Sequence, residues 1–360
     1  MSRAPKKERD GEAQESDAFA GAPHPRLAPR LVGHAAAEAE MLGAYRSGRL
    51  AHAWLIGGGE GIGKATLAWR FARFVLAYPD PKSPEVLAAR DLSVPAHHPV
   101  VRQLEALSHP DFALLRRAWN EKTGTGPYTE IRVDDVREEM RIFHFSSAFG
   151  GWRVAIVDSA DDLNRNSANA LLKIIEEPPP KSLILILAHR MGAVMPTIRS
   201  RCRRLLLEPL SAGEVEEIVV GLGPPWSDAG AGIAAAAAKA NGSVREALRR
   251  LEPASQTVGA MIETAIARLP KGNARLNLRL ADVVSARGAE EHFERLMLAL
   301  YDWLEGEAKK PSSPARLEAI ADLWGVIRAH AREANALNLD KRATLMAAFE
   351  EIATRAALLG

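Results

Sequence analysis

Residues 53–76 read AWLIGGGEGIGKATLAWRFARFVL, and this stretch decides the fold. The apolar run 53–57 predicts a buried strand, and residues 65–76 have the pattern of a helix. Between them lies G-x-x-x-x-G-K, from Gly58 to Lys64. Glycines in such a loop let backbone N–H groups surround phosphate oxygens, and the helix N-terminus adds a favourable dipole. The stretch therefore predicts a phosphate-binding loop in an α/β domain.

Further apolar runs alternate with helical patterns on both sides of this loop, as is typical of a parallel sheet covered by helices. The five candidate strands are Ala53–Gly57, Phe112–Leu115, Arg153–Val157, Leu183–Leu187 and Arg203–Leu207. Residues 78–110 carry six prolines and cannot form one continuous helix, so we expect an irregular insertion there. We predict a doubly wound parallel-sheet domain over residues 29–208.

After Pro209 the pattern becomes purely helical. Ser211 with Glu214, and later Ser243 with Glu246, are capping boxes that predict helix starts in a small domain over 209–252. We expect a helical bundle over 253–360, with apolar residues at helical spacing: Phe293, Met297, Leu300, Leu304; Leu317, Ile320, Leu323, Ile327; Leu345, Phe349 and Ile352. The fold class is thus α/β plus α, and the mixed-charge residues 1–28 are expected to form a disordered tail.

Composition excludes several classes of protein. The 360 residues contain one cysteine, which rules out an internal disulfide and a multi-cysteine zinc site and favours a reducing, cytosolic compartment. The apolar run 182–188 is about a third of the length of a membrane-spanning helix, so no membrane insertion is expected. The net charge of +2 gives no overall electrostatic case for tight DNA binding.

Two positions indicate how well the loop could support hydrolysis. Position 65 usually holds the Ser or Thr that binds Mg²⁺, but here it is Ala65, and Thr66 comes one residue late. The third strand ends in Asp158, a placement suited to Mg²⁺, yet Ser159 follows where an active ATPase would have a glutamate. We expect that nucleotide can bind and that hydrolysis is poor or absent. The alternatives are a glycine-rich turn without ligand and an ordinary strand-terminal acid.

Several other polar residues have competing interpretations. Asp161 and Asp162 are expected to cap the helix 164–176 rather than to replace the missing base. Arg245 lies in the first turn of a capped helix, where the helix dipole disfavours a cation, so it requires an anion or an acidic side chain. His97 and His98 have no partner at ligand spacing, and 109–111 is expected to be a turn before the second strand.

Taken together, these motifs resemble the bacterial clamp-loader family of AAA+ proteins over about residues 29–251. The resemblance rests on Gly48–His52, Gly58–Lys64, His109–Asp111, Asn169–Lys173 with Glu176–Pro179, Ser200–Cys202 and Gly242–Arg245. The run 168–179, ANALLKIIEEPP, is the most specific of them. Within the family, the chain is most similar to the delta-prime type, whose own ATP site is degenerate.

The resemblance implies roles for named residues. Arg201, in Ser200-Arg-Cys202, would be an arginine finger donated in trans to the γ-phosphate of a neighbouring gamma/tau subunit. Possible ATP binding would involve Gly58, Gly61, Gly63, Lys64, Thr66, Asp158 and the lid arginine Arg245, with no metal site assigned. Residues 209–252 would be the lid, and 253–360 the collar that joins the subunits.

The family's partners would be delta and gamma/tau subunits, with the sliding clamp and primed DNA reached through the complex. This chain departs from the family in lacking four zinc-binding cysteines in the insertion 78–110. We therefore expect no zinc, and an insertion that folds differently or without metal. The alternatives to a delta-prime subunit are an ATP-hydrolysing gamma/tau-type subunit and a scaffold with a vestigial loop.

Overall fold

The computed structural model describes residue 15 and residues 17–120, 126–286, 289–336 and 340–359. The chain divides into two compact units, 1–248 and 249–360, and each is described by itself. The boundaries that the sequence predicts at 208 and 252 remain predictions. Within the described part of the chain, no helix is long and apolar enough to cross a bilayer.

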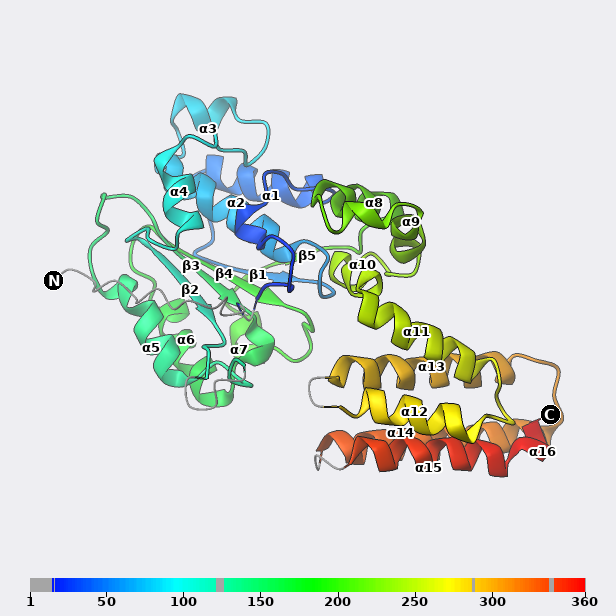
Figure 1. Cartoon of the computed structure of the whole chain (residues 1–360). Helices are drawn as coiled ribbons and strands as arrows, with labels where there is room; N and C mark the ends of the chain where they lie inside the picture. Colours follow the sequence, from blue (N-terminus) through cyan, green and yellow to red (C-terminus); the bar gives the residue numbers. More distant parts are fainter. Residues whose placement is uncertain (1–14, 16, 121–125, 287–288, 337–339, 360) are drawn as a thin grey trace. The chain divides into compact units, whose positions relative to one another are not determined.

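A five-stranded parallel sheet forms the centre of the first unit (Figure 1). Its strands are β1 (Ala53–Gly57), β2 (Phe112–Arg116), β3 (Arg153–Asp158), β4 (Ser182–Ala188) and β5 (Arg203–Leu206), in the spatial order β2-β3-β4-β1-β5. All five predicted strands are confirmed to within one residue at each end. Burial on both faces explains this agreement for β1, β3 and β4, because such strands read as continuous apolar runs, whereas three of the four residues of the edge strand β5 are exposed.

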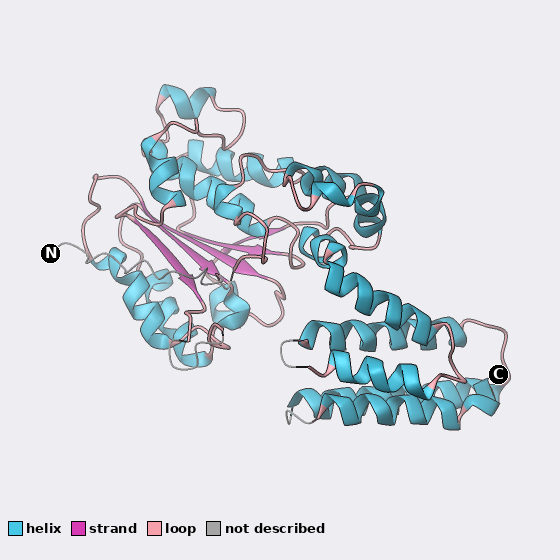
Figure 2. Cartoon of the chain, in the orientation of Figure 1, coloured by secondary structure: helices cyan, strands magenta, loops and turns pink. Residues whose placement is uncertain are grey.

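Helices cover both faces of the sheet (Figure 2). Alternate strand residues separate two cores: Trp54 and Ile56 pack on one face, and Ala53 and Leu55 on the other. The first core includes α1 (Ala35–Arg46), α2 (Lys64–Ala77), α3 (Pro84–Ala88) and α4 (Pro99–Glu105). The second includes α5 (Val133–Glu139), η2 (Met140–His144), η3 (Ala160–Asp162), α6 (Arg165–Glu176) and α7 (Pro196–Arg199). The predicted doubly wound α/β architecture is thus confirmed.

The Pro-rich insertion 78–110 contains the short helices α3 and α4, each with proline at its first position, where no N–H is needed. The Arg46 guanidinium donates to the carbonyls of Val86, at 2.7 Å, and Ala89. Glu38 on α1 accepts the Leu92 N–H at 3.2 Å. Side chains of the covering helices therefore hold this segment by its backbone.

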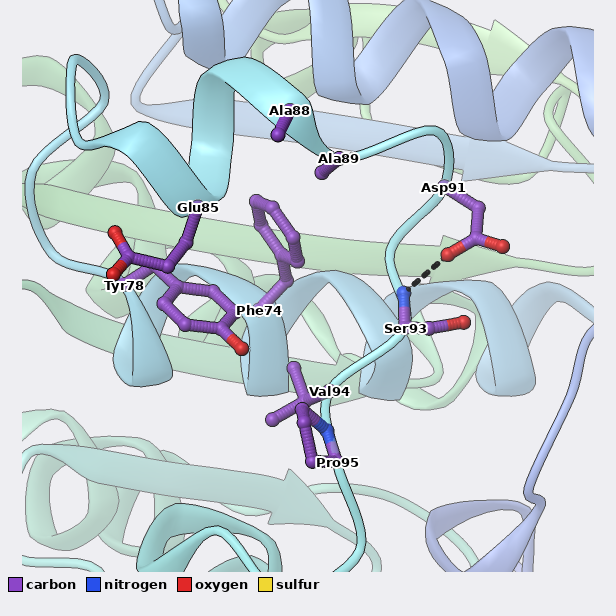
Figure 3. A pocket seen from close by; sticks show the side chains of 9 residues that line it. All are labelled: Phe74, Tyr78, Glu85, Ala88, Ala89, Asp91, Ser93, Val94 and Pro95. Atoms are coloured by element: carbon purple, nitrogen blue, oxygen red, sulfur yellow. Dashed lines mark hydrogen bonds between the residues drawn. The ribbon is translucent and has the colours of Figure 1, made fainter.

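A hollow of about 460 Å³ lies between this insertion and α2 (Figure 3). Phe74 and Tyr78 form one wall, and the other residues come from the insertion: Glu85, Ala88, Ala89, Asp91, Ser93, Val94 and Pro95. Asp91 accepts the Ser93 N–H at 2.8 Å, which shapes the turn at the rim. The hollow is lined mainly by apolar surface and lies apart from the glycine loop.

After β5 the chain forms α8 (Ala212–Gly221), η4 (Ser227–Ala229), α9 (Ala231–Ala238) and α10 (Val244–Leu251). The first capping box is confirmed, since Ser211 Oγ accepts the Glu214 N–H at 3.3 Å and the Glu214 carboxylate accepts the Ser211 N–H at 2.8 Å. At the second, Ser243 Oγ accepts the Glu246 N–H at 3.1 Å. Helix α10 begins in the first unit and ends in the second.

The second unit is helical, as predicted. It contains α11 (Pro253–Ile266), α12 (Ala274–Val284), α13 (Glu290–Ala308), α14 (Pro314–Ala336), α15 (Lys341–Thr354) and α16 (Ala356–Leu359). Ten of the eleven apolar residues singled out in the sequence are buried in one core. The exception is Leu317 near the start of α14, which is 43% exposed.

The N-terminal arm, which we define as residues 17–28, is a correction to the predicted disordered tail. It includes the turn η1 (Pro25–Leu27), which packs beside α2. His24 is buried with its ring edge-on to Trp69 at 5.8 Å, and the Arg26 carbonyl accepts a hydrogen bond from Arg73. Composition suggested disorder because the arm is fixed by scattered polar contacts rather than by an apolar run. Residues 1–14 and 16 lie outside the described residues.

Candidate nucleotide site and arginine motif

The glycine loop joins the end of β1 to the start of α2 and needs glycine for its backbone. Gly58, Gly61 and Gly63 have φ angles of +143°, +74° and +106°, where side chains cause strain. A Cβ on Gly58 would lie 2.7 Å from the carbonyl oxygen of Leu207. The predicted pattern G-x-x-x-x-G-K is therefore dictated by backbone conformation as well as by any ligand.

The helical segment after β5 contacts this loop directly. The Val244 N–H donates to the Gly61 carbonyl at 2.9 Å, and a Cβ on Gly61 would lie 2.5 Å from the Cβ of Arg245. Arg245 forms an ion pair with Glu60 of the loop at 3.2 Å. The predicted acidic partner of Arg245 is thus Glu60, and the pair places this arginine at the loop.

Lys64 is buried at the start of α2. Its ammonium donates to the carbonyls of Gly58, at 2.9 Å, and Gly59, at 2.5 Å. Burial lowers the pKa of Lys64 to about 8, although the charge of Asp158 opposes this shift. Thr66 is half-buried in the first turn of the same helix. These hydrogen bonds hold the Lys64 ammonium at the glycine loop, where it could contact a bound phosphate.

Asp158 ends β3 and lies on the same edge of the sheet as the loop, because all the strands are parallel. Desolvation raises the pKa of Asp158 to about 7, and the negative charge of Asp17 in the N-terminal arm adds to the shift. The charges of Lys64 and Arg116 act in the opposite direction. Near neutral pH a proton would therefore compete with any cation for this carboxyl group.

The acids after Asp158 do not cap the next helix, which corrects the prediction made for them. Asn164 is the N-cap of α6 and accepts the N–H groups of residues 166 and 167, both at 3.0 Å. Asp161 instead accepts the backbone N–H groups of His189 and Arg190, at 2.6 and 2.9 Å. Asp162 pairs with Arg117 at 3.2 Å. Asp161 therefore ties the loop after β3 to the end of β4.

His189 belongs to this site and was missed in the sequence. It follows β4 directly, and its pKa is lowered by burial and then by the positive charge of Lys64. A polar residue immediately after a buried parallel strand is the signal that could have identified it, as it did for Asp158. The carboxyl edge of the sheet thus carries Lys64, Asp158, Asp161 and His189.

Arg201 does not join this group. It lies between α7 and β5, is 42% exposed at its side chain, and pairs with Glu176 at 2.9 Å. Strand β5 runs parallel to β1, with Arg203 beside Trp54 and Leu206 beside Gly57. Arg201 is therefore at the amino end of these strands, and the glycine loop is at their carboxyl end. At about 3.3 Å per residue, strand length alone separates the two levels by roughly 10 Å.

The neighbouring Cys202 has a structural environment. Its side chain is buried in the core beneath α6 and α7, and burial raises the pKa of the thiol to about 12. A thiol in this protonated state is a weak nucleophile. The buried side chain of Cys202 anchors residues 200–202 to this core, and the neighbouring Arg201 remains exposed.

The sequence of this chain is similar to those of several DNA polymerase III subunits. The family model described as "DNA polymerase III, delta subunit" matches residues 33–211. DNA polymerase III subunit delta' of Pseudomonas aeruginosa is 34% identical over 154 residues, which are 42% of this chain and 42% of that protein. DNA polymerase III subunit gamma of Buchnera aphidicola is 27% identical over 235 residues, 64% of this chain and 59% of that protein.

A solved structure of a DNA polymerase III gamma subunit-related protein from Thermotoga maritima is 17% identical, with a TM-score of 0.42, and covers 88% of this chain and 99% of that one. DNA polymerase III subunit delta' of Escherichia coli is 29% identical over 170 residues, 47% of this chain and 46% of that protein. The chain thus spans about half the length of the delta' relatives that it matches. The match of residues 33–211 and the similarity to the delta' subunits of two bacteria support a DNA polymerase III clamp-loader subunit of the delta-prime type.

Proposed function

We propose that this chain is the delta-prime subunit of a cytoplasmic DNA polymerase III clamp loader, which loads the sliding clamp onto primed DNA. In this proposal it assembles with delta and gamma/tau subunits, and the helices of 253–360 form its share of the collar. Clamp and DNA are reached through the complex. The chain contributes Arg201 in trans to the ATP of a neighbouring gamma/tau subunit.

The position of Arg201 is the observation that carries this proposal. The side chain is exposed at the sheet edge opposite to the chain's own glycine loop, so it does not serve that loop and is accessible to another subunit. Its ion pair with Glu176 is exposed on both sides, and such a pair is weak enough to open at low cost. A guanidinium supplied in trans stabilises the charge on a transferring phosphoryl group and can accelerate hydrolysis by orders of magnitude.

The chain's own glycine loop is proposed to hydrolyse ATP weakly or not at all. Residue 65 is alanine, so the first turn of α2 lacks the hydroxyl that would hold Mg²⁺. Ser159 follows Asp158 and cannot act as the base that orients an attacking water. If nucleotide does bind, Lys64 and the loop glycines would hold the phosphates, and Arg245 would neutralise the terminal one.

Reconstitution of the complete loader tests the proposal. Arg201→Ala should leave assembly intact and lower clamp- and DNA-stimulated ATP hydrolysis by at least tenfold. Arg201→Lys should recover little of the loss, because an ammonium cannot replace the planar fork of a guanidinium. Arg204→Ala is the matched control, since Arg204 is also exposed and belongs to β5. Equal hydrolysis rates for Arg201→Ala and wild type would contradict the proposed role.

A further inference from the structure

The N-terminal arm lies on the group of residues that would surround a nucleotide. At its start, Asp17 pairs with Arg116 and accepts a hydrogen bond from His24 Nε2 at 3.0 Å. Arg116 ends β2, and in the register of the sheet it lies beside Asp158. Asp17 is therefore at the carboxyl edge of the sheet, and its charge acts on Asp158.

Two residues further along, the arm reaches the lid arginine. The guanidinium of Arg245 lies 5.7 Å from the centre of the Phe19 ring, within the range of a cation–π contact. The same ring packs edge-on against Trp226 at 5.8 Å, and Trp226 Nε1 donates to the Gly21 carbonyl at 2.9 Å. Phe19 and Gly21 are thus fixed against the lid.

The spacing of these contacts defines the path of the arm. Asp17 and Phe19 are two residues apart, so their Cα atoms are separated by at most about 7 Å. Asp17 contacts Arg116, which lies beside Asp158, and Phe19 contacts Arg245, which pairs with Glu60 of the loop. The short chain between them therefore links the two groups, Asp158 and Arg245, that a bound triphosphate would have to reach together. In Figure 1 this is the dark-blue segment that begins the described chain.

The arm also supplies a charge of the same sign as the ligand. Burial alone would raise the pKa of Asp17, but His24 and Arg116 outweigh it, and the pKa lies below its ordinary value. Asp17 is therefore ionised at neutral pH, and its side chain is only 2% exposed. A nucleotide approaching Asp158 would therefore meet the buried Asp17–Arg116 ion pair as well as the backbone of the arm.

We propose that the N-terminal arm occupies the chain's own nucleotide site and excludes ATP until the arm is displaced. Asp17 blocks the side of Asp158, and Phe19 covers Arg245. This inference rests on the proposed function, in which the loop of Lys64 is not the site of hydrolysis, and it adds that the arm limits nucleotide binding at that loop. Contacts of Arg26 with the Glu105 carbonyl, at 3.0 Å, and of Arg73 with the arm hold it in place.

Binding of a fluorescent N-methylanthraniloyl ATP with Mg²⁺ to the full chain, measured by anisotropy, tests the inference. The double variant Asp17→Ala/Phe19→Ala should bind the probe at least tenfold more tightly than the wild type. Leu27→Ala is the matched control, because Leu27 is an exposed arm residue away from these contacts, and it should change binding by less than twofold. Adding Lys64→Ala to the double variant should abolish the gain. A folded double variant with wild-type affinity would overturn the inference.

A second measurement uses the wild type and does not depend on the folding of any variant. Millimolar MgATP, at a concentration where equilibrium dialysis detects binding, should increase hydrogen exchange in residues 17–24. If the amide protection of the arm is unchanged when ATP is bound, the arm and ATP occupy the chain at the same time. That result would also overturn the inference. Both of these negative results would concern nucleotide binding by the isolated chain. The role of Arg201 is tested separately, by ATP hydrolysis in the assembled loader.

Discussion

Arg201 and Glu176 form an ion pair with a separation of 2.9 Å at the amino ends of the strands, at the edge opposite to Lys64. Both side chains are more than 40% exposed. Glu176 ends α6, whose sequence is the most specific motif of the chain, and Arg201 lies in the short Ser-Arg-Cys motif. The pair therefore joins two motifs that are 25 residues apart in one surface site.

The strength of this pair gives a first prediction. An exposed ion pair contributes at most about 1 kcal/mol, and in its proposed role Arg201 would leave Glu176 to contact a phosphate. Glu176→Gln should therefore keep hydrolysis by the reconstituted loader equal to the wild type or raise it, up to about fivefold. Steady-state ATPase assays with clamp and primed DNA measure this. A loss of tenfold or more would mean that Glu176 is needed to position Arg201.

Asp158 gives a prediction about pH. Its pKa of about 7 in the folded chain is above its ordinary value of 3.8, so between these values the folded state holds a proton that the unfolded state has released. The free energy of unfolding contributed by this group consequently falls as the pH rises from 4 to 7. Asp158→Asn removes the penalty, and its advantage over the wild type should grow by about 2–4 kcal/mol between acid and neutral pH.

Urea titrations at several pH values measure this difference. Asp228→Asn, which changes an exposed aspartate of the same unit, is the control and should give a nearly constant difference from the wild type. The interpretation of Asp158 would be wrong if its variant also gave a constant difference from pH 4 to 8.

The sequence was most informative where the type of each residue is set by its own burial or by its own local chemistry. The central strands were predictable because both of their faces are buried, which makes the run 182–188 of β4 almost entirely apolar. Gly58, Lys64 and Asp158 could be singled out because a phosphate-binding loop requires particular residues at fixed spacing after a strand, and the structure places all three at one edge of the sheet, while their ligand stays a prediction. Arg201 was identified only through its motif, since its exposed guanidinium has no distinguishing composition around it.

The sequence was least informative where a contact joins distant segments. Asp17 meets Arg116 only after β2 has folded into the sheet, and nothing in residues 17–28 signals that partner. Asp161 accepts backbone N–H groups after β4, and every residue except proline offers such a group, so this contact left no pattern in the sequence. The errors about the arm and about the cap of α6 both have this origin.

Gly61 gives a prediction about the contact between loop and lid. Its φ is +74°, and an added Cβ would lie 2.5 Å from both Ser243 Oγ and Arg245 Cβ. Gly61→Ala should therefore destabilise the first unit by about 2–4 kcal/mol, from backbone strain and overlap together. Calorimetry should show this as a lower unfolding temperature.

A second glycine provides the contrast. Gly325 lies inside α14, and a Cβ there would meet nothing within 4 Å. Gly325→Ala should raise stability by about 0.5–1 kcal/mol, because alanine loses less backbone entropy in a helix. The explanation given for Gly61 would be wrong if Gly61→Ala and Gly325→Ala changed the stability in the same direction.

Arg46 gives a prediction about the insertion 78–110. Its guanidinium donates to the carbonyls of Val86 and Ala89, and these bonds hold the segment against α1. Arg46→Ala should lower the free energy of unfolding by about 1–3 kcal/mol, because two carbonyls lose a charged donor, and should increase proteolysis within residues 80–98. Arg90→Ala, an exposed arginine of the same insertion, should change stability by less than about 0.5 kcal/mol. Excess EDTA should leave the melting temperature of the wild type unchanged, whereas a fall of several degrees would show that a bound metal, rather than Arg46, stabilises this segment.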